Sequence, residues 1–150
     1  MLVLSTTCQI DKTKDAALKI AKEKNGRLIT VFVLDSKIPN TVFEELTDMG
    51  FIGEKPGVEL TETVMREYRK QAYEKLDEIE ADAKSRNIEF KGVVSVGGFV
   101  EEAVKAAEDL KADCLVVPKC KEAKLWKLVF GSSVDELKKR LGCEVIVVEE

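Results

Sequence analysis

The chain has 150 residues, of which 45% are hydrophobic, so it can form the core of one domain but is too short for two. Its 24 Lys and Arg and 28 Asp and Glu give a net charge of −4, which argues against nucleic acid as an obligatory partner because phosphate-backbone binding needs a strongly basic face. The chain contains no histidine, the commonest general base and metal ligand, so most hydrolase and metalloenzyme classes are disfavoured.

Short apolar runs alternate with amphipathic segments along the chain. Apolar runs rich in β-branched residues predict buried strands, and apolar residues that recur every three or four positions predict helices. In chain order, we expect a strand over residues 2–4, a helix over 11–24, a strand over 27–34, a long helix over 60–86, a strand over 91–96, a helix over 100–110, a strand over 114–118, a helix that begins beside Ser133 and a strand over 144–148.

The segment between the second and third strands is the irregular part of this plan. Thr41 and Glu44 form a capping-box pair, which predicts a short helix to about residue 49. The glycines that follow indicate an ordered turn up to residue 57. The apolar stripe of the long helix that comes next favours contact with the core over a partner site.

Residues 131–133 precede and open the last helix. Ser133 stands three residues before Glu136, so the two side chains can cap each other's backbone N–H groups in a capping box. Gly131 and Ser132 then lie just outside the helix, where free N–H groups and the helix dipole favour an anion such as phosphate. Alternatively, Gly131 only permits a tight turn and the two serines only cap the helix.

Five strands joined by helical crossovers predict an α/β fold. The expected architecture is a single doubly wound, five-stranded parallel sheet with strand order 3-2-1-4-5 and helices on both faces, formed by one domain over residues 1–150. In that order, strands one and four are neighbours whose connections leave in opposite directions, so a crevice opens beyond their carboxyl ends. Residues 5–8 follow strand one, and residues 118–121 follow strand four.

The loop after strand four keeps the spacing of a glycine motif, which is Gly-x-x-Gly, nine residues and Gly-Ser. Gly131 and Ser132 match the end of this motif, whereas Pro118 and Lys121 stand at its two earlier glycines. Two glycines and an acidic helix start also follow strand three, at residues 97–102. In these features the chain resembles the universal stress protein family, which has an adenine nucleotide alpha hydrolase-like fold, over essentially its whole length.

The resemblance implies a nucleotide site at the crevice that takes ATP or AMP, although no cofactor is required and no metal is expected. The substitutions favour impaired ATP binding, because Pro118 has no N–H to donate to a phosphate. The long side chain of Lys121 either clashes with the ligand or replaces amide contacts with a charge. The implied nucleotide-binding residues are Thr6, Thr7, Val33, Gly97, Gly98, Lys119, Lys121, Gly131, Ser132 and Ser133.

Three functions remain open, and we rank them in the following order. The first is a regulatory binding module of the universal stress protein type that has lost tight ATP binding and acts through its dimer or an unknown protein partner. The second is a nucleotide- or phosphate-binding stress protein that uses Lys121 and the helix start at residues 131–133. The third is a thiol-redox protein that uses Cys8 and Cys120 but lacks a Cys-x-x-Cys motif. We expect no enzyme, because no general base stands near the phosphate turn.

The four cysteines fall into two pairs on neighbouring strands. Cys8 and Cys120 are expected at the carboxyl edge of strands one and four, and Cys114 and Cys143 near the amino edge of strands four and five. Either pair would come within reach of a disulfide if the strand order holds. Free thiols are favoured for Cys114 and Cys143, because a buried free cysteine is a common small apolar core residue.

The last strand is expected at an edge of the sheet, and a long apolar edge favours pairing with another chain. In the resembled family, the equivalent strands of two subunits meet across a twofold axis. This implies a homodimer through Val145, Ile146, Val147 and Val148. Trp126, the only tryptophan, is expected to fill the core or contact a second subunit rather than to stack on an adenine.

No apolar run approaches the roughly 20 residues of a membrane span, and residues 1–4 are too short for the core of a signal peptide. We therefore expect a cytoplasmic protein without a membrane partner. Few Asn and Gln accompany the abundant Lys and Glu, a composition that leans towards a heat-adapted source.

Overall fold

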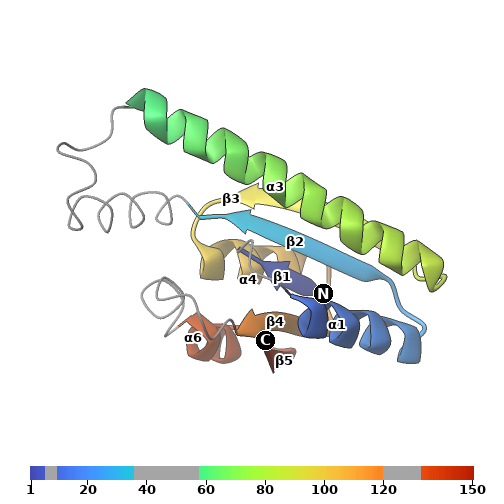
Figure 1. Cartoon of the computed structure of the whole chain (residues 1–150). Coiled ribbons are helices and arrows are strands. Elements are labelled where there is room, and N and C mark those ends of the chain that lie inside the picture. Colours follow the sequence, from blue (N-terminus) through green and yellow to red (C-terminus); the bar gives the residue numbers. More distant parts are fainter. Residues whose placement is uncertain (6–9, 36–57, 120–132) are drawn as a thin grey trace.

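Five parallel strands form one sheet in the computed structural model, which describes residues 1–5, 10–35, 58–119 and 133–150 (Figure 1). The strand order is β3-β2-β1-β4-β5, and every neighbouring pair runs parallel. The fold class and the strand order predicted from the sequence are therefore confirmed. The strands are β1 (Leu2–Leu4), β2 (Leu28–Leu34), β3 (Phe90–Val96), β4 (Cys114–Lys119) and β5 (Glu144–Glu149).

Helices cover both faces of the sheet, as a doubly wound fold requires (Figure 1). The helices that the structure describes are α1 (Asp11–Glu23), α3 (Val58–Ser85), α4 (Phe99–Asp109) and α6 (Ser133–Arg140). One face carries α1 and α3, over a core that includes Leu18 and Phe32. The other face carries α4 and α6, over a core that includes Val31 and Leu137. The sheet is thus buried on both sides, which explains why its inner strands are continuous apolar runs.

β1 is the central strand although it spans only three residues. All three of its side chains are completely buried, because β2 and β4 flank it and helices cover both faces. Its pairing with β2 extends along its whole length, whereas its pairing with β4 is limited to Leu2 opposite Val116. Beside this pair, the main-chain nitrogen of Met1 donates to the carbonyl oxygen of Cys114 at 2.6 Å, which joins positions 113 residues apart.

The predicted element boundaries agree with the structure to within two residues. Arg27, predicted as the first residue of the second strand, precedes β2 and is exposed, because its charge stays in solvent while the buried Leu28 begins the strand. α6 begins at Ser133 itself, and the capping box with Glu136 stays a prediction. The short helix predicted over residues 41–49 and the turn up to residue 57 lie outside the described residues.

The two cysteines near the amino edge face opposite sides of the sheet. Cys114 lies opposite Glu144, so Cys143 is offset by one residue, and side chains one residue apart along strands point to opposite faces. Cys114 packs in the core beneath α1 and α3, whereas Cys143 packs on the side of α4 and α6. Both are free thiols, and this offset explains why the alternative of a disulfide between them is not realised. Cys8 and Cys120 lie outside the described residues.

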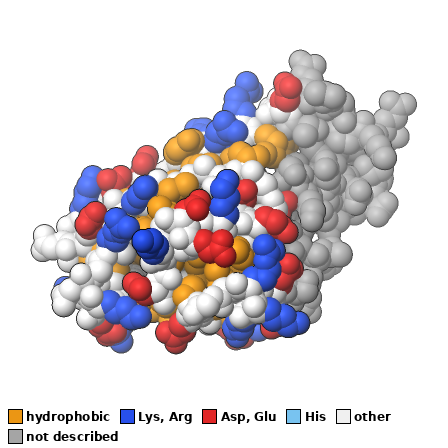
Figure 2. Space-filling model, turned by 180° about the vertical axis from the view of Figure 1, so that it is seen from behind, with side chains coloured by type: hydrophobic (Ala, Val, Ile, Leu, Met, Phe, Trp, Pro, Cys, Tyr) orange, Lys and Arg blue, Asp and Glu red, His pale blue; other side chains and the backbone are white. Residues whose placement is uncertain are grey.

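The surface carries a dense mixture of charges. On the face opposite to that of Figure 1, Lys and Arg are interspersed with Asp and Glu, and hydrophobic side chains show between them (Figure 2). The described residues on this side therefore form no uniformly basic area of the kind that nucleic acids bind. Among the described helices, none is long and apolar enough to cross a membrane.

Candidate functional site

The carboxyl ends of the parallel strands meet at one edge of the sheet, which we call the carboxyl edge. Ser5 follows β1, Asp35 follows β2, Gly97 follows β3 and Lys119 ends β4. Ligands of doubly wound folds bind at this edge, where neighbouring connections diverge. The described part of the candidate site therefore consists of these four positions, the start of α4 and the start of α6.

Pro118 lies near the carboxyl end of β4, beyond the point where β1 pairs with β4. Because Leu2 lies opposite Val116, the register places Leu4 opposite Pro118. Pro118 has no N–H, so it cannot donate to a strand ladder. On its other side it is paired with Val148 of β5, and its side chain is buried. The proline therefore offers no N–H at this position, either to β1 or to a ligand.

Asp35 caps the start of α4 from a neighbouring strand. This residue is 3% exposed, and its Oδ2 atom accepts a hydrogen bond from the backbone N–H of Phe99 at 3.2 Å. Gly98, the N-cap residue of α4, has no side chain that can do this, so Asp35 takes over the role. The positive end of the helix dipole also stabilises a carboxylate at this position. The protein itself therefore supplies the acceptor for the first amide of α4.

The partly buried phenol of Tyr68 links α3 to the end of β1. The Tyr68 hydroxyl donates to the carbonyl oxygen of Ser5, and its ring packs edge to face on Phe32 with ring centroids 5.8 Å apart. Burial raises the pKa of Tyr68 above its ordinary value, and the negative charge of Asp35 adds to this effect. The Oγ atom of Ser5 is also buried and has no hydrogen-bond partner among the described residues. Such a hydroxyl is a candidate ligand contact.

Two glycines form the turn between β3 and α4. Gly97 has a φ of 157° and donates its N–H to the carbonyl oxygen of Leu34 at 3.2 Å. A Cβ atom on Gly97 would lie 2.9 Å from Cγ of Glu102, and one on Gly98 would lie 2.2 Å from Oε2 of Glu101. The acidic side chains at the start of α4 therefore fold back over this turn, and carboxylates lie against both of the predicted binding glycines.

The other predicted site residues that the structure describes are Lys119, Val33 and Ser133. Lys119 forms an ion pair with Glu149, with 2.8 Å between Nζ and Oε1, and both side chains are half exposed. Such a pair is weak, so it can open for a ligand. Val33 is completely buried in the core beneath α4, and Ser133 is buried at the start of α6. The predicted site residues outside the described part of the chain are Thr6, Thr7, Lys121, Gly131 and Ser132, and Trp126 also lies outside it.

The sequence profile of the universal stress protein family matches residues 11–149, from α1 to β5. The chain belongs to the universal stress protein family. No curated protein sequence matches this universal stress protein significantly.

Solved structures of other universal stress proteins share the fold. One from Burkholderia pseudomallei superposes with a TM-score of 0.66 and is 19% identical over 98% of this chain and 94% of that chain. A universal stress protein in complex with cAMP has a TM-score of 0.63 and 22% identity over 98% of this chain and 94% of that chain. A family protein from Arabidopsis thaliana with AMP bound has a TM-score of 0.59 and 11% identity over 100% of this chain and 92% of that chain. At these identities the likeness establishes the fold.

Two residues at the carboxyl edge of this universal stress protein, Asp35 and Tyr68, were not predicted from the sequence as site residues. Asp35 directly follows the apolar run of β2, and the rule that singled out the residues after strands one and four applies equally to it. Tyr68 gave no signal beyond the apolar stripe of its helix, because the partner of its hydroxyl lies 63 residues away in the sequence. Within the described residues, no group of three or more Cys, Asp or Glu is arranged to hold a metal ion.

Proposed function

We propose that this universal stress protein is a regulatory binding module in which tight ATP binding is impaired, and that it performs no catalytic step. The observation that carries the proposal is the buried carboxylate of Asp35 at the carboxyl edge. A triphosphate carries several negative charges. A carboxylate that solvent screens poorly opposes the binding of such a ligand nearby.

Two further features support weak ATP binding. Pro118 lacks the N–H that a glycine at this position offers to a phosphate. The turn at Gly97 and Gly98 lies against the carboxylates of Glu101 and Glu102, so it adds negative charge to this edge. Both features lower the expected affinity for ATP, as the Asp35 carboxylate does.

A second candidate function is the binding of an adenine nucleotide that carries fewer negative charges. Universal stress proteins with this fold have been solved with AMP and with cAMP. The Asp35 carboxylate opposes a monophosphate less than a triphosphate, and it opposes the singly charged cAMP least. The buried hydroxyl of Ser5 is a candidate contact for such a ligand. Lys121 and the helix start at residues 131–133 are the groups expected to hold its phosphate.

Calorimetric titration of nucleotide-free protein with ATP, AMP and cAMP tests both candidates, with Trp126 fluorescence followed in parallel. We expect ATP to bind only at millimolar concentration, which corresponds to about −4 kcal/mol. Asp35→Asn should tighten ATP binding by roughly tenfold, because it removes the opposing charge. Asp77→Asn removes an exposed carboxylate from α3 and is the matched control, for which we expect unchanged affinity.

Each outcome of this titration separates the candidates. Micromolar ATP binding that disappears in Ser132→Ala and Lys121→Met would overturn the proposal and show that a lysine replaces the missing glycine contacts. Binding of AMP or cAMP without ATP would support the second candidate. An absence of heat with all three nucleotides would leave a nucleotide-independent module and direct the search to its protein partner.

We also propose that the protein forms a homodimer through β5. This strand lies at the edge of the sheet, and Val145, Ile146, Val147 and Val148 are only partly buried within one chain. A second copy would cover this continuous apolar edge. Sedimentation velocity should give the dimer mass, and Ile146→Lys should shift it to the monomer. Val96→Lys on β3, the opposite edge strand, is the control that should leave the dimer intact, and a monomer at every concentration would refute the dimer.

A further inference from the structure

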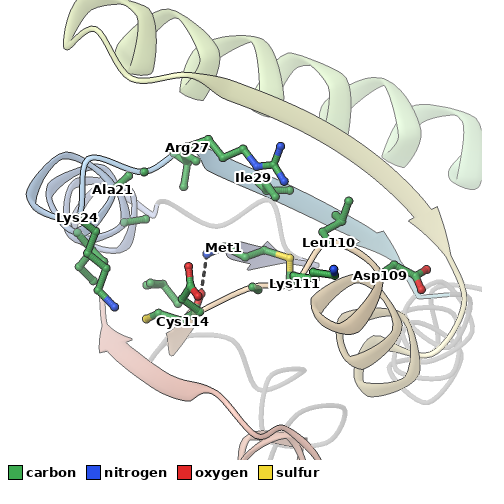
Figure 3. A pocket seen from close by; sticks show the side chains of 16 residues that line it. Met1, Ala21, Lys24, Arg27, Ile29, Asp109, Leu110, Lys111 and Cys114 are labelled. Carbon is green, nitrogen blue, oxygen red and sulfur yellow. Dashed lines mark hydrogen bonds between the residues drawn. The ribbon is translucent and has the colours of Figure 1, made fainter.

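A cavity lies at the amino edge of the sheet, opposite the carboxyl edge. It has a volume of about 400 Å³, which is within the range of small-molecule sites. The second half of α1, the start of β2 and the turn between α4 and β4 line it, and Met1 lies between them (Figure 3). We call it the amino-edge cavity, and its lining residues are Met1 and parts of segments 17–29 and 109–116. All of them belong to the described part of the chain.

Three cationic side chains from three different segments line the amino-edge cavity. Lys24 follows α1, Arg27 precedes β2 and Lys111 lies in the turn before β4. Within the described residues, none of the three forms an ion pair. In Figure 3 the Lys24 side chain points away from those of Arg27 and Lys111, so the three cations surround the cavity and do not meet at one point.

The cavity also contains two carboxylates, Asp109 and Asp113. Neither forms an ion pair with Lys24, Arg27 or Lys111, although all five side chains line the same hollow. Three cations against two carboxylates leave an excess of positive charge, which favours an anion. The carboxylates add acceptors for a hydroxyl or amino group on the same ligand.

Apolar side chains line the cavity between these charges. They include Ile20 of α1, Ile29 of β2 and Leu110 at the end of α4, together with the buried Cys114. Figure 3 shows Arg27 and Ile29 on one side of Met1 and Cys114 on the other. A cavity with an apolar lining and charged residues around it suits a ligand that has both an apolar body and a charged group.

We propose that the amino-edge cavity binds a small organic anion with an apolar body, and that the positive charge of Lys24, Arg27 and Lys111 around the cavity attracts its carboxylate or phosphate group. The apolar lining takes the body of the ligand. This site does not depend on nucleotide binding at the carboxyl edge, because the strands separate the two edges and no residue of one lines the other.

Titration with anilinonaphthalene sulfonate tests the proposal, because this dye is an anion with an aromatic body whose fluorescence rises in apolar surroundings. We expect saturable binding to the natively folded protein. The triple variant Lys24→Gln, Arg27→Gln, Lys111→Gln should bind the dye at least about tenfold more weakly, a change of roughly 1.4 kcal/mol. The matched control is the double variant Lys22→Gln, Lys105→Gln, which removes exposed lysines of α1 and α4 that do not line the cavity. This control should change the affinity for the dye by less than about twofold.

Two competitors then identify the anionic group. Phenyl phosphate and benzoate share an apolar ring, so the stronger competitor shows whether phosphate or carboxylate is preferred. Inorganic phosphate, which has no apolar body, should displace the dye only weakly. Displacement by inorganic phosphate at the same concentration as phenyl phosphate would overturn the role of the apolar lining.

A cavity-filling variant tests the location independently of charge. Ala21→Leu should abolish dye binding while it leaves every charge in place, and Ala112→Leu in the partly exposed turn serves if the first variant unfolds. Nuclear magnetic resonance shifts on dye binding should centre on Gly26 and Ala112. Equal affinity of the triple variant and its control, or shifts confined to Ser5 and Asp35 at the carboxyl edge, would overturn the proposal.

Discussion

The polar groups at the two edges of the sheet differ in whether they have partners within the protein. At the carboxyl edge, Asp35 accepts a hydrogen bond from Phe99, and Tyr68 donates one to the main chain after β1. At the amino edge, three cations line a cavity and form no ion pair within the described chain. Buried groups that are paired inside a protein support its stability, whereas exposed groups with unbalanced charge are available for binding. Substitutions should therefore lower stability at the first edge and affinity at the second.

The largest effect is expected for Phe32→Ala. Phe32 is completely buried, and its ring supports that of Tyr68. Removing it leaves a cavity, so the free energy of unfolding should fall by about 3–5 kcal/mol. Urea denaturation followed by circular dichroism measures this loss. Phe90→Ala on β3, where the ring is only partly buried, is the control, and an equal loss there would contradict a special dependence on Phe32.

Asp35→Ala should have the next largest effect. It removes the acceptor of the Phe99 N–H in a buried position, so we expect a loss of about 1–3 kcal/mol in the free energy of unfolding. Asp35→Asn keeps an oxygen acceptor at this position and should cost less. If the two variants were equally stable in urea, the hydrogen bond to α4 would not contribute to folding.

Tyr68→Phe should cost about 1 kcal/mol at neutral pH, because it removes the hydrogen bond to Ser5. The same variant tests a pH dependence. The pKa of Tyr68 is raised above 10.0 in the folded protein, so the unfolded chain loses this proton first as the pH rises. The stability that protonated Tyr68 contributes is complete below about pH 10, the pKa of the unfolded chain, and is lost as the pH rises towards the pKa of the folded protein. Urea denaturation at several alkaline pH values should show a shallower decline for Tyr68→Phe.

The control for this profile is Tyr73→Phe, which removes an exposed phenol from the same helix. A decline in stability that is identical in wild type and Tyr68→Phe would show that the Tyr68 proton is not linked to folding.

The smallest effect on stability is expected at the amino edge. Lys24→Gln and Lys111→Gln remove exposed cations that form no ion pair within the described residues, so each should change the free energy of unfolding by less than about 0.5 kcal/mol. Thermal unfolding with and without the dye sharpens the comparison, because only the stabilisation by bound dye should be lost. A large loss of stability without ligand would mean that these charges serve the fold.

Much of the fold could be predicted because the strands are buried on both faces. A continuous apolar run such as that of β2 can be buried on both faces only between two layers of helices. Right-handed crossovers then limit the strand order. The central position of β1 followed from the same rules although the strand has only three residues. Boundaries were less certain at charged residues such as Arg27, where the side chain's need for solvent decides the end of the strand.

Contacts between distant segments could not be predicted from the sequence. The cap that Asp35 provides for α4 joins residues 64 positions apart, and local patterns describe only caps within a few residues. The orientation of Cys114 and Cys143 depended on a one-residue register that apolar composition does not specify. The amino-edge cavity was not predicted for a related reason. Lys24, Arg27 and Lys111 have no feature in the sequence that sets them apart from other surface residues, and only the fold brings them to the same cavity.

The three-residue central strand also constrains how the chain folds. The pairing of β1 with β4 brings Leu2 opposite Val116, at the other end of the sequence, so it has a high contact order and should form late. During translation, one side of this completely apolar strand stays without its neighbour until residues 114–119 have left the ribosome. An unpaired apolar strand is prone to aggregation. β1 is therefore the segment of the nascent chain that we expect to need protection by a chaperone.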